Sequence, residues 1–252
     1  MGESVSFSVQ VLGTSGMYAT VERACSGYLV RLDNKKIWLD AGAGTWRGLL
    51  AEISYEEIDG VILSHRHPDH TTDVFQAYHA RRYGGPEALP TIPLWAPAET
   101  IDYLLAFIEE FNESFDLHAV TANDSLEVAG AMVNFVSMAH PPETLGVRIE
   151  KEGKVFAYSA DSGEAADFGR LASRADIFVC EATLQDGDEL WDGHLSGAQA
   201  GRIGADTRVE RLVLTHLPPG RDHETTLKEA RGTADTVSVE LAADGMLIEL
   251  VP

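Results

Sequence analysis

The segment "VILSHRHPDH" at residues 61–70 constrains this chain more than any other. Residues 61–63 form an aliphatic run typical of a buried strand. Directly after that run come His65, His67, Asp69 and His70. A loop held by the end of a rigid strand is a common place for functional side chains. The segment therefore predicts a sheet whose strand leads straight into a cluster of four donor side chains.

Imidazole nitrogens and carboxylate oxygens are the usual ligands of Zn²⁺, and a set without thiolates also suits Mn²⁺ or Fe. One tetrahedral ion needs only three or four of them. Three further candidates each follow a strand-like run: His140 after "VNFVSMA", Asp161 after "VFAYSA" and His216 after "RLVLT". Strand ends along one sheet edge can converge on one site. Taken singly, each candidate also fits a plain turn or loop role.

Strand and helix patterns recur in two successive halves. The first half predicts strands at 4–13, 26–33, 36–40 and 60–64, and helices at about 45–52, 70–82 and 98–111. The second predicts strands at 131–138, 146–150, 155–159, 176–180, 212–215, 236–241 and 246–251, and helices near 164–174, 197–206 and 224–231. No low-complexity linker separates the halves, so we expect residues 1–252 to form one layered α/β domain with two sheets between outer helices.

Composition limits the partners. The net charge of -21, from 40 acidic and 19 basic residues, disfavours broad binding to nucleic acids or anionic membranes. No apolar run approaches the roughly 20 residues of a membrane span. Cys25 and Cys180 are the only cysteines, which favours a cytoplasmic protein without a disulfide framework, although one bridge between them stays open.

The "HRHPDH" motif followed in order by His140, Asp161 and His216 resembles the metallo-β-lactamase fold superfamily. The resemblance implies an αββα sandwich holding two divalent metal ions, with zinc favoured and manganese open. In this family pattern one ion takes His65, His67 and His140. The other takes Asp69, His70 and His216, and Asp161 bridges both. Asp40, which ends "KIWLD", matches a position that supports the ligands through a hydrogen bond to an imidazole; a plain turn role is the alternative.

Four other stretches resemble the ribonuclease Z-like branch, and within it most closely the small bacterial cyclic-nucleotide phosphodiesterases. These are "VLGTSG", "VERACSGYLV", "FVCEATL" with Glu181, and "GHLSGAQA" with His194. The resemblance implies phosphodiester hydrolysis in which Asp69 orients the attacking water, His194 donates a proton or stabilises charge, and Glu181 holds His194. Independently, Ser196 and Gln199 fit a capping box, which would start a helix just after His194 and favour a phosphate there.

The spacing between ligands narrows the substrate. Only 20 residues separate His140 from Asp161, whereas ribonuclease Z enzymes carry a long tRNA-binding arm there. We therefore expect a small phosphodiester, such as a 3′,5′-cyclic nucleotide or a short oligonucleotide, and neither tRNA nor a membrane as partner. Three rivals remain: tRNA 3′ processing without the arm, a thioester or lactone hydrolase, and a metal-binding sensor or scaffold without catalysis. Homodimer formation is also left open.

Several polar residues have a functional and a plain interpretation. Arg221, Arg82 and Tyr83 could each contact substrate. A surface ion pair accounts for Arg221 equally well. Arg82 and Tyr83 close the helix after the motif, and a structural role at that helix end is the favoured interpretation. The same two interpretations apply to Arg81, which lies at the same helix end. Three histidines match no ligand position and are expected to be structural or exposed: His79, His118 and His223.

Overall fold

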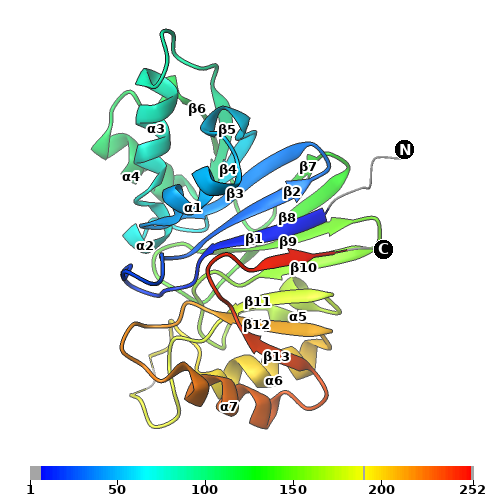
Figure 1. Ribbon diagram of the computed structural model, residues 1–252. Helices are drawn as coiled ribbons and strands as arrows, with labels where there is room; N and C mark the ends of the chain where they lie inside the picture. The colour runs from blue at the N-terminus through cyan, green and yellow to red at the C-terminus, as the bar shows by residue number, and fades with distance from the viewer. Residues whose placement is uncertain (1–6, 190, 251–252) are drawn as a thin grey trace. The chain divides into compact units, whose positions relative to one another are not determined.

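The computed structural model describes residues 7–189 and 191–250, which divide into two compact units (Figure 1). Unit 1 contains the chain up to Val120 and the segment Ala243–Glu249; unit 2 begins at Thr121 and continues to Ala242. Residues 4–6 and 251, which belong to two of the expected strands, lie outside the described residues. The two units correspond to the two expected halves except at the last strand. The strand expected at 246–251 in the second half is β14 (Leu247–Glu249), which pairs with β1 (Phe7–Gly13) in the sheet of unit 1. The assignment of one domain to residues 1–252 stays a prediction.

Unit 1 contains a seven-stranded mixed sheet in the order β14-β1-β2-β3-β4-β5-β6. Neighbouring strands from β14 to β3 are antiparallel, and β3 to β6 run parallel. The strands are β1 (Phe7–Gly13), β2 (Gly27–Leu32), β3 (Lys35–Ala41), β4 (Gly60–Ile62), β5 (Ile92–Ala96), β6 (Phe115–Ala119) and β14 (Leu247–Glu249). Because β3 and β4 are parallel, their carboxyl ends lie at the same edge of this sheet.

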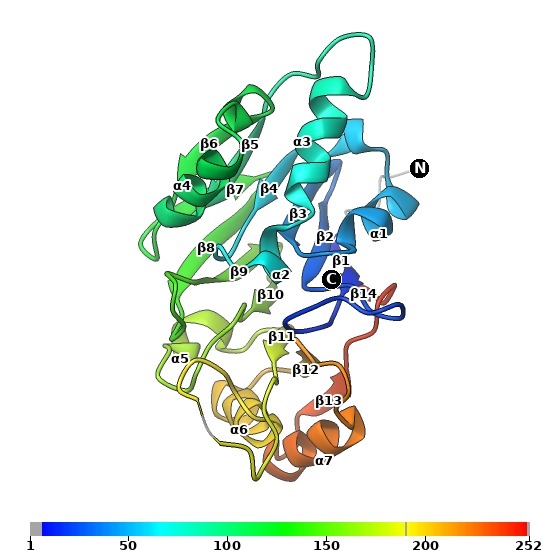
Figure 2. The same cartoon turned by 90° about the vertical axis from the view of Figure 1, so that its left-hand side faces the viewer.

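Helices cover the unit 1 sheet and bury its apolar side chains (Figure 2). They are α1 (Thr45–Glu52), η1 (Tyr55–Glu57), α2 (Pro68–Thr71), α3 (Val74–Tyr83), α4 (Ala98–Phe107) and η2 (Phe111–Glu113). Leu49 of α1, Val74 of α3 and Leu104 of α4 belong to the same core cluster as Trp38 of β3. This burial against the sheet gives the short helices their stability, since isolated helices of this length are marginal in water.

Unit 2 contains the second seven-stranded mixed sheet, in the order β13-β12-β11-β10-β9-β8-β7. Strands β7 to β10 are antiparallel neighbours, and β10 to β13 run parallel. The strands are β7 (Ser125–Val128), β8 (Ala131–Ser137), β9 (Leu145–Lys151), β10 (Lys154–Tyr158), β11 (Ile177–Glu181), β12 (Arg211–Thr215) and β13 (Ser238–Leu241). A two-residue turn joins β9 to β10, with positive φ at both Glu152 and Gly153, as tight hairpins require.

Three helices pack in unit 2: α5 (Phe168–Ala172), α6 (Gly197–Thr207) and α7 (His223–Thr233). Helices α6 and α7 lie side by side (Figure 1). Their backbones approach closely, since a Cβ on Gly201 would lie 2.2 Å from the carbonyl oxygen of Ala230. The expected capping box is present: Ser196 and Gln199 each bond the other's backbone N–H. These contacts fix the start of α6, and His194 lies two residues before its N-cap residue Ser196.

Some elements differ from the sequence-based prediction. The helix expected at 70–82 is two helices, α2 and α3, separated at Thr72 and Asp73. The helix expected at 98–111 ends at Phe107 and is followed by η2. Strands β5, β6 and β7 were not predicted. Pro93 in β5 has no backbone N–H to donate to a neighbouring strand, which argues against a central strand in the sequence. Strands β6 and β7 are edge strands with several exposed side chains, so their sequences lack the pattern of a buried strand.

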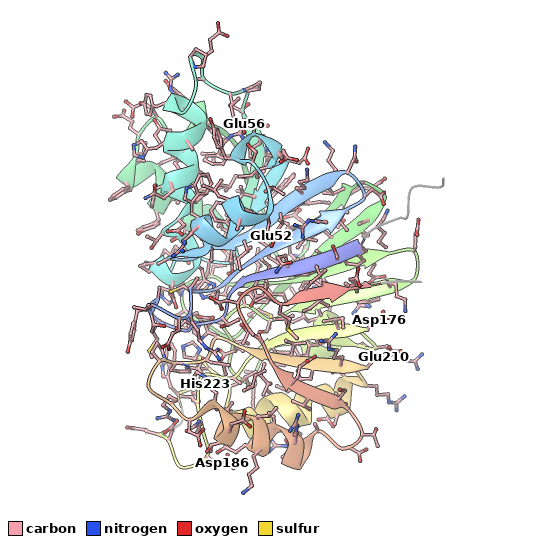
Figure 3. All side chains as sticks on the ribbon, viewed as in Figure 1. Glu52, Glu56, Asp176, Asp186, Glu210 and His223 are labelled. Atoms are coloured by element: carbon pink, nitrogen blue, oxygen red, sulfur yellow. The ribbon has the colours of Figure 1, made fainter. Side chains whose placement is uncertain are left out.

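Charged side chains are spread over the surfaces of both units. The labelled carboxylates in Figure 3 include Glu52 and Glu56 of unit 1 and Asp186 and Glu210 of unit 2, all exposed. Among the residues that the structure describes, no helix is long and apolar enough to cross a membrane.

Candidate functional site

In unit 1, the predicted donors follow the end of β4. His65 and His70 are fully buried, Asp69 is buried and His67 is half-buried. Pro68 begins α2, where its fixed φ and missing N–H suit the first helical position, so Asp69 and His70 lie on one tight turn. The centroid of the His65 ring lies 4.7 Å from that of the His67 ring and 4.2 Å from that of the His70 ring. The four predicted donors are thus gathered locally within this unit.

Asp40, at the end of the neighbouring strand β3, organises this cluster. Its carboxylate accepts a hydrogen bond from His70 Nδ1 at 2.8 Å and from the Ser64 hydroxyl at 2.8 Å. The same hydroxyl lies 3.0 Å from His65 Nδ1. Asp40 holds His70 directly and His65 through Ser64, which is the support expected for Asp40. Ser64 was not singled out from the sequence, although its place between Asp40 and His65 makes it part of the network.

The carboxylate of Asp69 has its own anchor in the loop after β1. Its Oδ2 accepts a hydrogen bond from the backbone N–H of Met17 at 2.7 Å. This loop therefore fixes the Asp69 carboxylate in addition to the helix turn that carries it. The loop itself is constrained, because Met17 has a φ of 69° and the Ser15 hydroxyl donates to the Tyr18 carbonyl oxygen.

Gly42, directly after β3, lets the backbone approach closely to that of Asp69 in α2. A Cβ at this position would lie 2.0 Å from the carbonyl oxygen of Asp69, a backbone atom that cannot swing aside. Gly42→Ala should therefore lower the free energy of unfolding by about 1–3 kcal/mol and also reduce bound metal, because Asp69 and His70 must move. Denaturant unfolding and metal content of the purified variant check both effects.

Gly48→Ala is the matched control for that substitution. Gly48 lies inside α1, and its Cβ would meet Leu12 only at 3.5 Å, an ordinary contact. It should leave metal content intact and raise stability by about 0.5–1 kcal/mol, the usual gain of alanine over glycine in a helix. A Gly42→Ala variant as stable and as metal-rich as Gly48→Ala would contradict this account.

In unit 2, four predicted residues lie at one edge of the sheet. His140 follows β8, Asp161 follows β10, Glu181 ends β11 and His216 follows β12. Strands β10, β11 and β12 are parallel neighbours, and β8 runs in their direction because both β8 and β10 are antiparallel to β9. The carboxyl ends of all four strands therefore meet at this edge, as the sequence predicted.

Asp161 lies between two histidines. Its Oδ1 is 3.4 Å from His216 Nε2 and its Oδ2 is 3.7 Å from His140 Nε2. These separations exceed a hydrogen bond of about 2.7–3.2 Å. Two ligands that each lie about 2.1 Å from one tetrahedral ion are about 3.4 Å apart. Each oxygen of Asp161 is thus placed to share an ion with a different histidine, which is what a bridging carboxylate requires.

Glu181 is the centre of the hydrogen-bond network in unit 2. It is fully buried, and its Oε1 accepts from His194 Nδ1 at 2.6 Å and from the Ser162 N–H at 2.8 Å. Its Oε2 accepts from the Thr183 hydroxyl at 2.8 Å and from the backbone N–H groups of Thr183 and Leu195. These donors stabilise a charge that would otherwise be costly to bury. The carboxylate is thereby held rigidly against His194.

Thr183 links the same carboxylate to His216. Its hydroxyl donates to Glu181 and lies 2.7 Å from His216 Nδ1, so it accepts the Nδ1 hydrogen. Unit 2 thus repeats the arrangement of unit 1, where Asp40 and Ser64 hold two histidines. Sequence reasoning missed Thr183, because one threonine two residues after a strand carries no signal of its own.

Thr183→Val should weaken metal binding about 10- to 100-fold, because His216 loses the acceptor that fixes its ring while the side-chain shape is kept. Chelator competition with the purified variants measures this affinity. Thr183→Ser retains the hydroxyl and should stay within about threefold of the original chain. Equal affinities for the valine and serine variants would show that this hydroxyl does not support a ligand.

The donor chemistry of both units fits divalent metal ions. Carboxylates, hydroxyls or a carbonyl accept the Nδ1 hydrogens of five histidines: His65, His70, His140, His194 and His216. In its neutral form each ring is therefore the tautomer whose Nε2 carries the lone pair. This nitrogen can bind a metal in the four predicted ligands among them: His65, His70, His140 and His216. Burial lowers the pKa of His140, which keeps its imidazole in the neutral form that a ligand needs.

The remaining candidates have structural partners. Arg221 forms an ion pair with Asp188, and Arg82 pairs with Glu113 at 2.7 Å. Tyr83 is exposed beside Arg82. Arg81 is buried and donates to the Pro90 carbonyl oxygen. The three other histidines lie outside both donor groups. His79 lies on α3 and His118 on the edge strand β6. His223, labelled in Figure 3, begins α7.

Both cysteines are buried free thiols. Burial raises the pKa of Cys180 well above its usual value and that of Cys25 to about 12. Both therefore stay protonated near neutral pH and do not act as nucleophiles.

Residues 35–217 match the model of the beta-lactamase superfamily domain. This chain belongs to that superfamily. The matched range contains every residue of the predicted donor set, from His65 to His216.

Relatives extend the match over nearly the whole chain. The uncharacterized protein ML1173 of Mycobacterium leprae is 32% identical over 244 residues, covering 93% of this chain and 86% of that protein. The Bacillus subtilis protein named "Probable metallo-hydrolase YhfI" is 28% identical over 249 residues, covering 96% of this chain and 99% of that protein. The ribonuclease Z of Kineococcus radiotolerans is 27% identical over 299 residues, covering 96% and 94%.

The crystal structure of YhfI superimposes with a TM-score of 0.89 at 25% identity, covering 98% of this chain and all of that one. The predicted fold class is thereby confirmed: an α/β protein of the metallo-β-lactamase fold with two mixed sheets and helices. The chain is a superfamily member related to metallo-hydrolases and to ribonuclease Z, with histidine and aspartate clusters able to bind metals.

Proposed function

We propose that the chain is a dinuclear metal-dependent phosphodiesterase that cleaves small nucleotides, such as a 3′,5′-cyclic nucleotide or a short oligonucleotide. The observation that carries this proposal is the pair formed by His194 and the buried Glu181. Candidate ligand atoms of Asp161, His194 and His216 lie within 4.8 Å of one another. His194 thus lies beside the predicted metal ligands but is not one of them in the family pattern. That is the position expected of a proton donor.

The metals would be held in the family pattern. His65, His67 and His140 take one ion; Asp69, His70 and His216 take the other; and Asp161 bridges both. The fixed tautomers and the bridging geometry of Asp161 support this assignment. When bound, two divalent ions lower the pKa of a water molecule and polarise the phosphoryl oxygens. An all-nitrogen and oxygen donor set favours zinc and also accommodates manganese.

The chain's own residues would manage the protons. Asp69, anchored by the Met17 N–H, orients the attacking water. His194 enters the reaction as an imidazolium, with its Nδ1–H on Glu181 and its Nε2–H directed to the leaving oxygen. After it donates the Nε2 proton, the ring is the neutral tautomer that the Glu181 hydrogen bond already favours. A cyclic nucleotide would open to one molecule that carries a phosphomonoester and a free hydroxyl, and an oligonucleotide would be cut into two products. The attacking water would release a proton to solvent, and solvent would protonate His194 again.

Three features support a small substrate. The 20 residues between His140 and Asp161 form only the β9–β10 hairpin. The alignment with the Kineococcus ribonuclease Z spans 299 positions against the 252 residues of this chain, so at least 47 of its positions have no counterpart here. A net charge of -21 would also repel tRNA.

A substrate panel tests the proposal against its rivals. The metal-loaded chain should hydrolyse bis(p-nitrophenyl) phosphate and a 3′,5′-cyclic nucleotide, with far lower rates on a thioester and a lactone. Cleavage of a precursor tRNA at its 3′ end in preference to these small diesters would favour the ribonuclease Z rival. A metal-loaded chain inactive on every ester and phosphodiester would support the sensor or scaffold rival.

A further inference from the structure

Trp191 stands out among the large apolar side chains of unit 2. It is the first residue of the described segment 191–250, and 48% of its surface is exposed. By contrast, Trp38 in unit 1 is fully buried. An exposed indole beside polar groups is typical of a binding surface, because its apolar body gains from contact while its edge tolerates water.

The position of Trp191 is tied to the candidate site. Its ring centroid lies 5.0 Å from that of His194 and 5.4 Å from that of His140, both in edge-to-face arrangements. The backbone N–H of His194 donates to the Trp191 carbonyl oxygen at 3.1 Å. An indole in contact with the proposed proton donor and with a proposed metal ligand must border the space that a substrate enters.

The segment that carries the indole is anchored on both sides. The carbonyl oxygen of Gly193 accepts from His140 Nδ1 at 2.8 Å. A Cβ on Gly163 would lie 1.7 Å from the carbonyl oxygen of Asp192, so this segment lies directly on the chain that follows Asp161. The aromatic surface of Trp191 is therefore presented by a turn with close backbone contacts to the site.

We propose that Trp191 is the platform on which the nucleobase of the substrate stacks. This inference rests on the proposed phosphodiesterase function. It concerns the nucleobase, which a simple phosphodiester lacks. Every base offers a π-face, and stacking on an aromatic side chain is tolerant of sequence. Trp191 therefore favours nucleotides over base-free diesters, and purines over the smaller pyrimidines, without distinguishing adenine from guanine by hydrogen bonds.

Trp191→Ala tests the platform through the substrate. For 3′,5′-cyclic AMP we expect KM to rise about tenfold with kcat changed much less, since stacking contributes to binding of the base. For the 3′,5′-cyclic phosphate of methyl riboside, which has no base, the loss in kcat/KM should be at least fivefold smaller. Trp191→Phe keeps a π-face and should recover most of the affinity for cyclic AMP.

Met132→Ala is the control, because Met132 is 42% exposed at the beginning of β8, while His140 follows the other end of that strand. It should leave both KM values unchanged. Equal losses on the two substrates for Trp191→Ala, or a loss in kcat alone, would overturn the platform and show that the indole only positions or shields His194.

A binding measurement separates this proposal from the proposed function. Adenosine monophosphate added to the full chain should quench the indole fluorescence, and the quenching should be largely lost in Trp191→Phe. This readout needs no turnover. If no phosphodiester is hydrolysed but the quenching is Trp191-dependent, the proposed function fails and the platform stands. If cyclic AMP is hydrolysed but the quenching is the same in both chains, the platform fails alone.

Discussion

His194→Ala should lower kcat for a 3′,5′-cyclic nucleotide about 10²- to 10⁴-fold while both metal ions remain bound. The reason is that removal of a positioned proton donor affects the departure of the leaving oxygen, whereas the proposed ligand set contains no contribution from His194. Metal content of the purified variant and its steady-state kinetics measure the two parts of this expectation separately.

His118→Ala is the matched control, since His118 is an exposed histidine on the edge strand β6 with a hydrogen bond to Asp116. It should leave kcat and metal content unchanged. A His194→Ala chain that has lost an ion would place His194 among the ligands, which its distance to Asp161 and His216 permits geometrically. A chain that retains both ions and full turnover would remove His194 from the chemistry.

Asp161→Ala should weaken both metal sites together and lower turnover by more than about a hundredfold. Each carboxylate oxygen faces a different histidine, so one substitution removes a ligand and part of a negative charge from both ions. Metal titration of the purified variant, with the number of tightly bound ions as readout, checks this expectation.

Asp206→Ala serves as the control because Asp206 is an exposed aspartate near the end of α6. Its substitution should leave two ions tightly bound. If Asp161→Ala also retains two tightly bound ions, Asp161 is not a bridging ligand. If it loses only one, Asp161 belongs to a single site.

The fold, and the placement of the candidate donors at strand ends, could be predicted from the sequence because both depend on local patterns. Aliphatic runs such as residues 61–63 and 212–214 indicate buried strands, and a polar residue directly after such a run lies at the carboxyl end of a strand. The capping box at Ser196 and Gln199 likewise depends on residues three positions apart. Resemblance then assigned the roles that local pattern leaves open.

The hydrogen-bond network around the donors could be predicted only in part. The resemblance indicated that Asp40 and Glu181 each support an imidazole, but it gave no sign of the hydroxyls of Ser64 and Thr183. Thr183, for example, contacts His216 across 33 positions of the sequence. Trp191 next to His140 depends equally on the close approach of the backbone at Gly163. Such contacts follow from strand order and glycine-permitted approach, which a single sequence does not reveal.

Titration of the metal-free chain with zinc, followed by hydrolysis of 3′,5′-cyclic AMP, tests the central claim most directly. The account predicts that activity rises with added zinc and reaches its plateau at two ions per chain. A plateau at one ion, or hydrolysis that is independent of zinc and manganese, would contradict a dinuclear phosphodiesterase.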